Sequence, residues 1–476
     1  MDKKTYTNYF KNKKILMMGL GILGRGVNVA KFLAECGAEL TITDLKTEEQ
    51  LAPSLKKLSK FSNIKYVLGK HDLADFSGKD MVIKAAGVPL DSLHIAEARK
   101  NKIPVEMDAS LFAKLAELGG STSTWRLNLQ VQIVGITGTR GKSTVTHLIY
   151  EIIKEAFKNT KRKVNLGGNV KGLATLPLLK TIKPNDVVVM ELDSWQLQGF
   201  GDAQISPNVA VFTTFLPDHL NYYNGDMDKY FSDKANIFKF QKENDFFVAG
   251  EKFFRNVKSF VKSAGIETEK DFKNGNIKSK IVIAKKGDIP KNWKVKLLGE
   301  HNLQNIALAV EAARKIGVKD TAIKKAVEKF KGLPGRLELV REVRGVKYYN
   351  DTTATTPDGV LAGLEALKKY RGKIILLGGG ADKNLEYEEY AKVVKKYVKA
   401  LILFRGLASN KIIEALGKTK FPVEVVDSMK NAMEIAKDKT KKGDVVLLSP
   451  GAASFGVFKN EFDRGDQFVK EVKKLK

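Results

Sequence analysis

Short apolar runs alternate with stretches of helical periodicity through residues 13–118. Lys14–Gly19 predicts a buried strand, and the helical stretch that follows it ends at Cys36. Glu39–Asp44 predicts a second strand, and Met81–Gly87 predicts a further one. Strands that alternate with helices in this way predict a parallel sheet.

The same alternation continues in the central part of the chain. Val131–Val134 predicts a buried strand, and the apolar spacing of Val145–Phe157 predicts a helix soon after it. Asp186–Glu191 and Asn208–Thr214 predict two more strands, whereas Tyr230–Phe238 has the spacing of a helix. These elements predict a second, mainly parallel sheet.

A third group of strands follows Lys331–Arg336, a segment whose glycines and proline predict a hinge. Its predicted strands, separated by helices, lie near 346–349, 373–377, 400–404, 423–426 and 445–448. Gly119–Thr124, rich in Gly, Ser and Thr, predicts a linker before the central strand. The chain is therefore predicted to be an α/β protein of three domains, at 1–122, 123–332 and 333–476, with Rossmann-like domains at both ends.

Composition narrows the class of protein. Of 476 residues, 43% are hydrophobic and 29% are charged, which is ordinary for a globular protein. The single cysteine, Cys36, excludes a disulfide framework and favours a reducing cytoplasm. No apolar run is long enough to span a bilayer, and the N-terminal residues lack the apolar segment of a secretory signal, so we expect no membrane insertion.

The charge is less ordinary, because 82 Lys plus Arg against 54 Asp plus Glu leave a net charge of +28. The lysines are spread over the predicted helices, as at Lys324–Lys325 and Lys395–Lys396. A nucleic-acid footprint gathers on one element, so this dispersal favours a solvated surface, and we expect no nucleic-acid partner. A nucleic-acid-binding NTPase is kept as an alternative.

The stretch Gly135–Thr144, of sequence GITGTRGKST, lies between the central strand and its helix. Strand, glycine loop and helix in this order make a phosphate cradle, in which Gly138 and Gly141 let consecutive N–H groups point inward. Lys142 can reach the outer phosphates of a nucleoside triphosphate, and Ser143 can hold Mg²⁺. The pattern predicts a central P-loop ATPase domain, in the shorter form that lacks the first glycine.

A weaker nucleotide signal stands near the N-terminus. Gly19–Gly24 has the glycine spacing of a dinucleotide-binding turn, and Asp44 ends the next strand where it can reach a ribose hydroxyl. A nicotinamide-dependent oxidoreductase would explain this turn, but it would leave the Gly135–Thr144 loop without a role.

Polar side chains stand at the ends of otherwise apolar central strands. Glu191 ends one of them, and a carboxylate there is costly unless it meets a cation such as Mg²⁺. Asp218 and His219 follow another strand, and Lys234 lies in the helical stretch after them. Carboxyl ends of parallel strands share one edge, so these groups predict a site beside the phosphate loop.

Three strand ends in the last domain lead into polar loops, Asn350–Thr356, Gly378–Lys383 and Ser449–Ser454. We expect their side chains to meet at one mouth that faces the central domain. Lys383 would suit a substrate carboxylate there.

Together these stretches resemble the Mur ligase family over essentially the whole chain. The resemblance rests on GITGTRGKST, GGN at 167–169, ELDSWQL, GEHNLQN, GLPGRLE, NDTTATTP, LLGGGADK, LLSPGAAS and FKNEFDRGDQF, in the family's order, with GLGILG and TDLK near the N-terminus. It implies an N-terminal domain that binds the UDP of a precursor, a central ATP-binding domain and a C-terminal domain that binds an amino acid.

The resemblance also implies roles for individual residues. The ATP site would comprise Gly138, Thr139, Arg140, Gly141, Lys142, Ser143, Thr144, Asn302, Asn305, Arg336 and Asp351. The substrate sites would comprise Gly21, Ile22, Leu23, Asp44, Lys46, Gly87, Asn169, Thr355, Lys383 and Ser454. Lys142, Glu191, His219 and Lys234 would be catalytic. Two Mg²⁺ ions would be held by Ser143, Glu191, His219 and a carbamylated Lys234.

The implied activity is an ATP-dependent amide ligase of peptidoglycan synthesis, active as a monomer, that joins glutamate to UDP-N-acetylmuramoyl-L-alanine. D-Glutamate is favoured, with L-glutamate or another amino acid left open, because Thr353 replaces a lysine of the family pattern and Glu461 replaces an aromatic residue. Asp193 likewise stands where the family has a serine. Folylpolyglutamate synthase is the alternative within the ligases, but it would not need residues 13–118.

Overall fold

The computed structural model describes residues 3–22, 24–118, 131–260 and 278–475. The chain forms two compact units, Met1–Trp293 with Gln304–Glu328, and Lys294–Leu303 with Lys329–Lys476. Leu23 and the predicted linker at 119–124, with the boundary inside it, lie outside the described residues. The domain limits at 122 and 332 stay predictions.

The first unit contains a five-stranded parallel sheet in the order β3-β2-β1-β4-β5. Ile15 and Met17 of β1 pack in the cluster that contains α2, whereas Leu16 and Met18 pack in the cluster that contains α4. Helices on both faces explain why β1 is apolar after its first residue. The elements are α1 Lys3–Phe10, β1 Lys14–Met18, α2 Arg25–Glu35, β2 Glu39–Asp44, α3 Glu48–Lys56, β3 Ile64–Leu68, η1 Leu73–Phe76, β4 Met81–Lys84, α4 Leu93–Lys100, β5 Val105–Glu106, α5 Asp108–Ala113 and η2 Lys114–Leu118.

The second sheet of this unit has six parallel strands in the order β11-β10-β9-β6-β8-β7. Its centre is β6, in which Ile136 pairs with Glu191 of β8 and Thr137 pairs with Phe212 of β9. The glycine loop, Glu191 and the residues after Phe212 therefore share one edge. The elements are β6 Gln132–Thr137, α6 Lys142–Ala156, β7 Val164–Gly168, η3 Leu176–Lys180, β8 Val187–Glu191, α7 Ser194–Asp202, β9 Val209–Phe212, α8 Leu220–Tyr223, α9 Met227–Ala235, β10 Phe246–Gly250, α10 Phe253–Phe260, β11 Lys280–Ala284, η4 Lys286–Asp288, α12 Glu300–Lys315 and α13 Asp320–Lys329.

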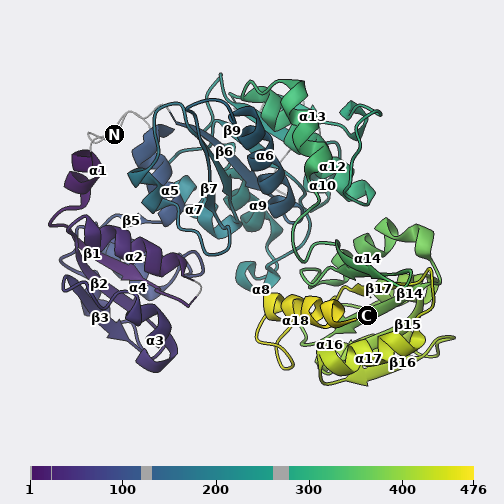
Figure 1. Ribbon diagram of the computed structural model, residues 1–476. Helices are drawn as coiled ribbons and strands as arrows, with labels where there is room; N and C mark the ends of the chain where they lie inside the picture. Colours follow the sequence, from purple (N-terminus) through teal and green to yellow (C-terminus); the bar gives the residue numbers. More distant parts are fainter. Residues whose placement is uncertain (1–2, 23, 119–130, 261–277, 476) are drawn as a thin grey trace. The chain divides into compact units, whose positions relative to one another are not determined.

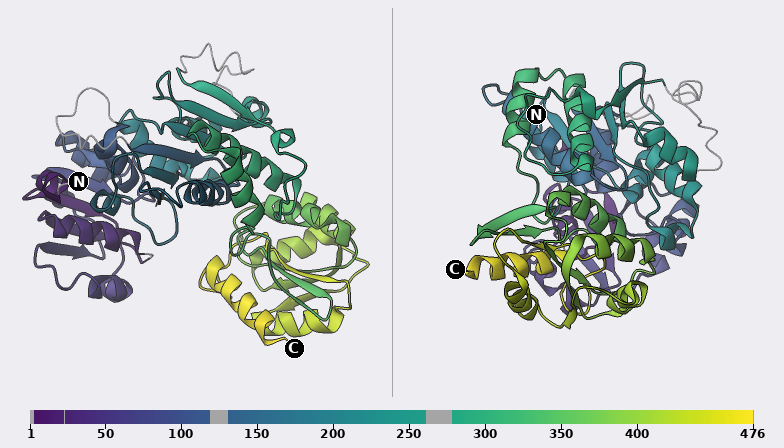
Figure 2. Two further views of the ribbon diagram at one scale, coloured as in Figure 1. Left: turned by 45° about the horizontal axis from the view of Figure 1, so that its top comes forward. Right: turned by 90° about the vertical axis from the view of Figure 1, so that its right-hand side faces the viewer.

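The second unit contains the third sheet, in the order β12-β13-β17-β14-β15-β16, parallel except for the pair β12 and β13. Ile374 and Leu376 of β14 pack with α14, α15 and α16, whereas Ile375 and Leu377 pack with α17 and α18. The green-to-yellow part of Figures 1 and 2 shows helices on both faces of this sheet. The elements are β12 Glu338–Val343, β13 Val346–Asn350, α14 Pro357–Ala366, η5 Lys368–Tyr370, β14 Ile374–Gly379, α15 Glu388–Tyr397, β15 Val398–Phe404, α16 Leu407–Leu416, β16 Val423–Val426, α17 Met429–Lys439, β17 Val445–Leu448 and α18 Glu461–Lys474.

Three mainly parallel sheets with helices packed on them confirm the predicted α/β class and its division around a central phosphate-loop sheet. In the described part of the chain, every helix is too short or too polar to cross a membrane.

Arg464, on α18, is fully buried in the second unit. Its guanidinium donates to Thr352 Oγ1 (3.1 Å), to the Thr352 carbonyl (2.9 Å) and to the Ala452 carbonyl (3.4 Å). Burial lowers its pKa to about 10, although Glu461 opposes the shift. The Arg464 guanidinium thus connects the polar loop that follows β13 to the polar loop that follows β17.

We predict that Arg464→Met destabilises the second unit by about 3 kcal/mol, because the buried carbonyls of Thr352 and Ala452 lose a charged donor. Hydrogen exchange of peptides covering residues 350–356 under denaturant titration measures this. Arg341→Met is the matched control, since exposed Arg341 donates to the Lys473 and Leu475 carbonyls at the surface. Equal shifts in the two variants would contradict the prediction.

Candidate active site

The glycine loop leads from β6 directly into α6. Gly138 has φ 136° and Gly141 has φ 87°. A Cβ atom at Gly138 would lie 2.1 Å from Thr213 Oγ1, and one at Gly141 would lie 2.4 Å from Asn305 Oδ1. At Gly138 conformation and space each exclude a side chain, whereas at Gly141 the left-handed conformation requires glycine.

The end of β9 holds this loop in place. The Thr139 N–H donates to the Thr214 carbonyl (2.7 Å), and the Arg140 N–H donates to Thr214 Oγ1 (2.8 Å). Thr139 Oγ1 donates to the Leu216 carbonyl at 3.0 Å. Bonds to a neighbouring strand end fix the loop before any ligand binds, which is the preorganisation that a phosphate site needs.

Two lysines converge on one carbonyl oxygen of the loop. Lys142 Nζ donates to the Gly138 carbonyl at 2.8 Å, and Lys234 Nζ of α9 donates to the same oxygen at 3.0 Å. Lys234 is 1% exposed, and its ammonium lies 4.9 Å from the centre of the Tyr230 ring. The site therefore concentrates positive charge in a confined space.

Burial lowers the pKa of both lysines. For Lys142 the carboxylate of Glu191 opposes the effect of burial. For Lys234 the positive charge of Lys142 adds to it, so the pKa of Lys234 lies well below its ordinary value. Like charges and low polarity both favour the neutral amine. Lys234 is thus the more readily deprotonated of the two.

Acidic and imidazole groups surround these lysines. Glu191 is 6% exposed at the end of β8, and Asp218 Oδ2 accepts from Arg140 Nη1 at 2.8 Å. His219 has φ 53°, and its ring lies 4.7 Å from that of Trp195, centre to centre. Burial lowers the pKa of His219 although Asp218 opposes this, so the imidazole is neutral near pH 7 and can act as a ligand.

The residues that the sequence assigned to metal binding lie at one edge of the central sheet, as predicted for strand ends. In the described part of the chain, no three His, Cys, Asp or Glu side chains form a ready metal cluster. The donors present nevertheless fit Mg²⁺, which takes one or two carboxylates together with substrate phosphates. Glu191 would supply such a carboxylate, and a carbamate on neutral Lys234 would supply another.

At the N-terminal sheet, Asp44 is more deeply engaged than the sequence suggested. Its Oδ2 accepts from the N–H groups of Leu20 and Gly21, both at 2.9 Å, and its Oδ1 accepts from the Lys46 N–H at 2.9 Å. Burial raises the pKa of Asp44, but these donors outweigh it and the net shift is downward. The carboxylate therefore shapes the glycine turn, and its contact with a ribose stays a prediction.

Other predicted substrate residues lie around this turn. Ile22 is 60% exposed, and Lys46 and Gly87 are also exposed. In the central sheet, the Asn169 N–H donates to the Glu191 carbonyl at 2.6 Å. Asn169 is therefore fixed to the strand that ends in the predicted metal ligand.

In the second unit, the predicted amino-acid residues come together in part. Lys383 Nζ donates to Thr355 Oγ1 at 3.0 Å, and a bridge between Ala381 and Ala453 brings the loop of buried Ser454 beside that of Lys383. That this mouth faces the central domain stays a prediction.

Asp351 lies deeper in this unit. It accepts from Ser449 Oγ at 2.9 Å and from the Leu337 N–H at 3.0 Å, and burial raises its pKa to about 7. Arg336 lies close enough for its charge to oppose that shift. Of the two α12 asparagines, Asn302 donates to the Leu298 carbonyl at 2.8 Å in the second unit, whereas Asn305 lies against Gly141 in the first.

Sequence reasoning missed Lys84, the last residue of β4. It is 2% exposed and donates to the Val88 carbonyl at 3.0 Å. Burial lowers its pKa to about 8, although Asp202, Asp193 and Asp233 oppose the shift. A charged residue at the end of an apolar strand was the available signal, as it was for Glu191.

Three profiles of known protein families match the chain. The profile of the Mur ligase middle domain matches residues 136–313, and that of the Mur ligase glutamate ligase domain matches residues 335–451. A third profile, the MurD-like N-terminal domain of Mur ligases, matches residues 13–106. The chain belongs to the Mur ligase family.

Two curated relatives of this Mur ligase are named UDP-N-acetylmuramoylalanine--D-glutamate ligase. The protein of Borreliella afzelii is 35% identical over 472 residues, 98% of each chain, and that of a Roseiflexus species is 36% identical over 490 residues, 97% of this chain and 98% of its own. The MurF ligase of Thermotoga maritima, solved with ADP, shares the fold at a TM-score of 0.56 and 20% identity, covering 98% of this chain and 97% of its own.

We predict that Lys84→Met stabilises the first unit at pH 7 by about 3 kcal/mol at most. The folded-state pKa of Lys84 is below its ordinary value of 10.5, so the wild type loses stability as pH falls from about 10.5 to about 8. The variant is spared that loss, and its advantage shrinks to under about 1 kcal/mol at pH 10. Unfolding midpoints at the two pH values measure this.

Lys100→Met is the control for this measurement, because Lys100 lies on α4, which packs on the same sheet as Lys84, and its side chain is 76% exposed. Its effect should stay within about 0.5 kcal/mol at both pH values. If the stability gained by Lys84→Met over wild type is smaller at pH 7 than at pH 10, the assignment of a buried charge to Lys84 is refuted.

Proposed function

We propose that this Mur ligase uses ATP to join D-glutamate to the L-alanine carboxylate of UDP-N-acetylmuramoyl-L-alanine, releasing ADP and phosphate, in peptidoglycan synthesis. Two relatives that match almost the entire chain carry the name of this activity. The observation that carries the proposal is the convergence of Lys142 and Lys234 on the Gly138 carbonyl. The Lys142 ammonium on a glycine loop at the start of a helix favours a polyanion such as a triphosphate, and the repulsion between the two lysines favours a neutral Lys234 that can become the carbamate.

The proposed reaction has two steps. The γ-phosphoryl group of ATP is transferred to the precursor carboxylate, which gives an acyl phosphate and ADP. The amine of glutamate then attacks the acyl carbon, and the tetrahedral intermediate loses phosphate to give the amide, with the amine proton passing to solvent. Lys142 and the loop N–H groups hold and neutralise the phosphates while this happens.

The ATP site of the proposal comprises the loop from Gly138 to Thr144, with Asn302, Asn305, Arg336 and Asp351 for the adenine nucleotide. Mg²⁺, held by Ser143, Glu191, His219 and carbamylated Lys234, would neutralise charge on the phosphates when bound. The lowered pKa of Lys234 supports the carbamate, because only the neutral amine reacts with carbon dioxide.

The precursor's UDP group is assigned to the N-terminal glycine turn, with Gly21, Ile22, Asp44, Lys46 and Gly87. A folylpolyglutamate synthase activity is disfavoured, because it would leave the five-stranded sheet built around this turn without a function. The incoming amino acid is assigned to Thr355, Lys383 and Ser454.

The choice of glutamate enantiomer rests on the relatives. Two of the three departures from the family pattern lie beside the loop that carries Thr355. Thr353 Oγ1 donates to the Gly335 carbonyl at 3.0 Å, whereas Glu461 contacts this loop through its backbone carbonyl, which accepts from Thr352 Oγ1 at 2.8 Å whatever the side chain. Neither residue supplies a cation for the distal carboxylate, which leaves that role to Lys383.

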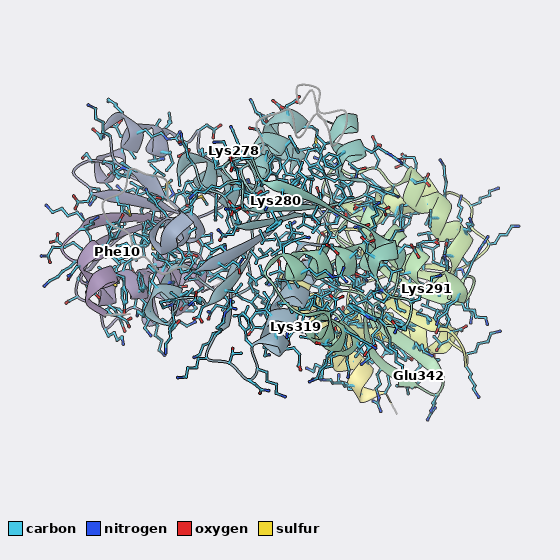
Figure 3. All side chains as sticks on the ribbon, turned by 90° about the horizontal axis from the view of Figure 1, so that it is seen from above. Phe10, Lys278, Lys280, Lys291, Lys319 and Glu342 are labelled. Atoms are coloured by element: carbon cyan, nitrogen blue, oxygen red, sulfur yellow. The ribbon has the colours of Figure 1, made fainter. Side chains whose placement is uncertain are left out.

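A nucleic-acid partner is disfavoured by the distribution of charge. Lys278 and Lys280 at the start of β11, Lys291 after η4 and Lys319 before α13 are all exposed and lie in three separate segments (Figure 3). A monomeric state and a cytoplasmic location, where ATP is supplied, complete the proposal.

We predict that phosphate release requires ATP, UDP-N-acetylmuramoyl-L-alanine and D-glutamate together, because the acyl phosphate needs both acceptor and amine to turn over. A coupled phosphate assay with a panel of amino acids, both glutamate enantiomers included, measures this. Absence of ADP formation with the precursor and every amino acid of the panel would overturn the proposed function.

Lys142→Ala should lower this turnover at least about a thousandfold, because it removes the charge that meets the outer phosphates. Lys154→Ala, on the exposed face of the same helix α6, is its matched control and should retain wild-type turnover. Turnover retained by Lys142→Ala would contradict the assignment of the loop.

We predict that Lys234→Ala is inactive and that short carboxylates partly restore its turnover, since they replace the carbamate oxygens in the cavity left by the side chain. Turnover with and without added acetate measures the rescue. Lys239→Ala, a lysine just after the same helix, should neither lose activity nor respond to acetate. Lack of rescue, with the wild type active, would count against the carbamate.

A further inference from the structure

Arg25 belongs to none of the motifs, yet it connects two of the predicted sites. It is the first residue of α2 and follows the N-terminal glycine turn directly. Its Nη2 donates to Asn169 Oδ1 at 2.8 Å, and its Nε donates to the Leu173 carbonyl at 3.1 Å. The guanidinium therefore reaches from the first sheet of the first unit to the loop after β7 of the second sheet.

That loop is held from other sides as well. Asn28 Nδ2, one turn along α2, donates to the Gly172 carbonyl at 3.3 Å. At the far end of the loop, the carboxylate of Asp108 accepts from the N–H groups of Thr175 (2.8 Å) and Leu176 (2.7 Å). The loop backbone is thus anchored independently of Arg25, so the two-point contact of Arg25 acts chiefly on the Asn169 side chain.

The chemistry of the guanidinium decides how the Asn169 amide is turned. Arginine has only donors, so the amide must present its Oδ1 atom to Arg25. The Nδ2 group then points away from the guanidinium, and its two N–H donors remain for oxygen atoms of a bound substrate. The planar fork fixes this orientation more firmly than a single ammonium would.

The Asn169 backbone carries the connection further. Its N–H donates to the carbonyl of Glu191, the residue proposed to hold Mg²⁺. A continuous series of contacts therefore leads from the glycine turn through Arg25 and Asn169 to the carboxyl end of β8.

We propose that Arg25 is a positioning residue for the UDP-linked precursor. It orients the Asn169 amide toward the substrate and holds the N-terminal glycine turn in register with the phosphate loop. The inference rests on the proposed function and adds to it a residue that acts through Asn169 rather than by touching the reacting atoms.

The test compares Arg25→Met with Arg99→Met. Arg99 lies on α4, which packs on the first sheet, and its Nη2 is 3.4 Å from Asp202 Oδ2 on α7, which packs on the second sheet. This contact lies away from the glycine turn. Arg25→Met should raise the KM for UDP-N-acetylmuramoyl-L-alanine about tenfold, with kcat and the KM for ATP within about twofold of wild type. Arg99→Met should leave all three within about twofold.

Two further variants separate positioning from charge and from direct contact. Arg25→Lys keeps the charge without the fork and should resemble Arg25→Met; full recovery of KM would overturn the proposal. Arg25→Met combined with Asn169→Ala should be no worse than Asn169→Ala alone, since both remove one oriented amide. A further tenfold rise in the double variant would mean that Arg25 contacts the substrate directly.

A substrate-free measurement keeps this inference distinct from the proposed function. The NMR signals of the Asn169 side-chain NH2 group should shift in Arg25→Met relative to wild type and stay unchanged in Arg99→Met. Unchanged signals and unchanged KM in Arg25→Met would contradict the inference. An inactive wild type would instead contradict the proposed function, while the NMR result would still decide whether Arg25 orients the Asn169 side chain.

Discussion

The Gly138 carbonyl oxygen, which accepts from the ammonium groups of both Lys142 and Lys234, is the point on which the active site depends. Two like charges in a confined space repel each other and lose hydration, so this arrangement persists only if one lysine is neutral or an anion lies between them. A phosphate of bound ATP would place an anion there, and the proposed carbamate on Lys234 would remove one of the two positive charges. The glycines of the loop, its bonds to the end of β9 and the carboxylate of Glu191 all serve to hold this charge in place.

Much of this arrangement could be predicted from the sequence, because the strands that carry it are buried on both faces. β1, β6, β8, β14 and β17 appear as apolar runs, and a polar residue that ends such a run is conspicuous. Glu191 was found in this way. The helix after the phosphate loop was placed three residues late, since Gly141 in a left-handed conformation starts it at Lys142.

Edge strands and long-range partners could not be predicted in the same way. β3, β11 and β12 are only partly buried, so their residues lack a continuous apolar pattern. The partners of Arg25 lie more than a hundred residues away along the chain, and no local spacing marks them. Asp44 shows the intermediate case, in which the pattern gave the place of the carboxylate but not its bonds to three backbone N–H groups.

Helix α12 contributes to both units, since Lys294–Leu303 belongs to the second and Gln304–Glu328 to the first. Leu298, just before this helix, packs on the core of the second unit, and a Cβ atom at Gly299 would lie 2.8 Å from that of Ala366. The polypeptide thus passes between the units three times, at 293, 303 and 328. A fragment cut at 333 would lack these packing residues and expose apolar surface, so the last sheet is not a detachable module despite its own complete set of strands.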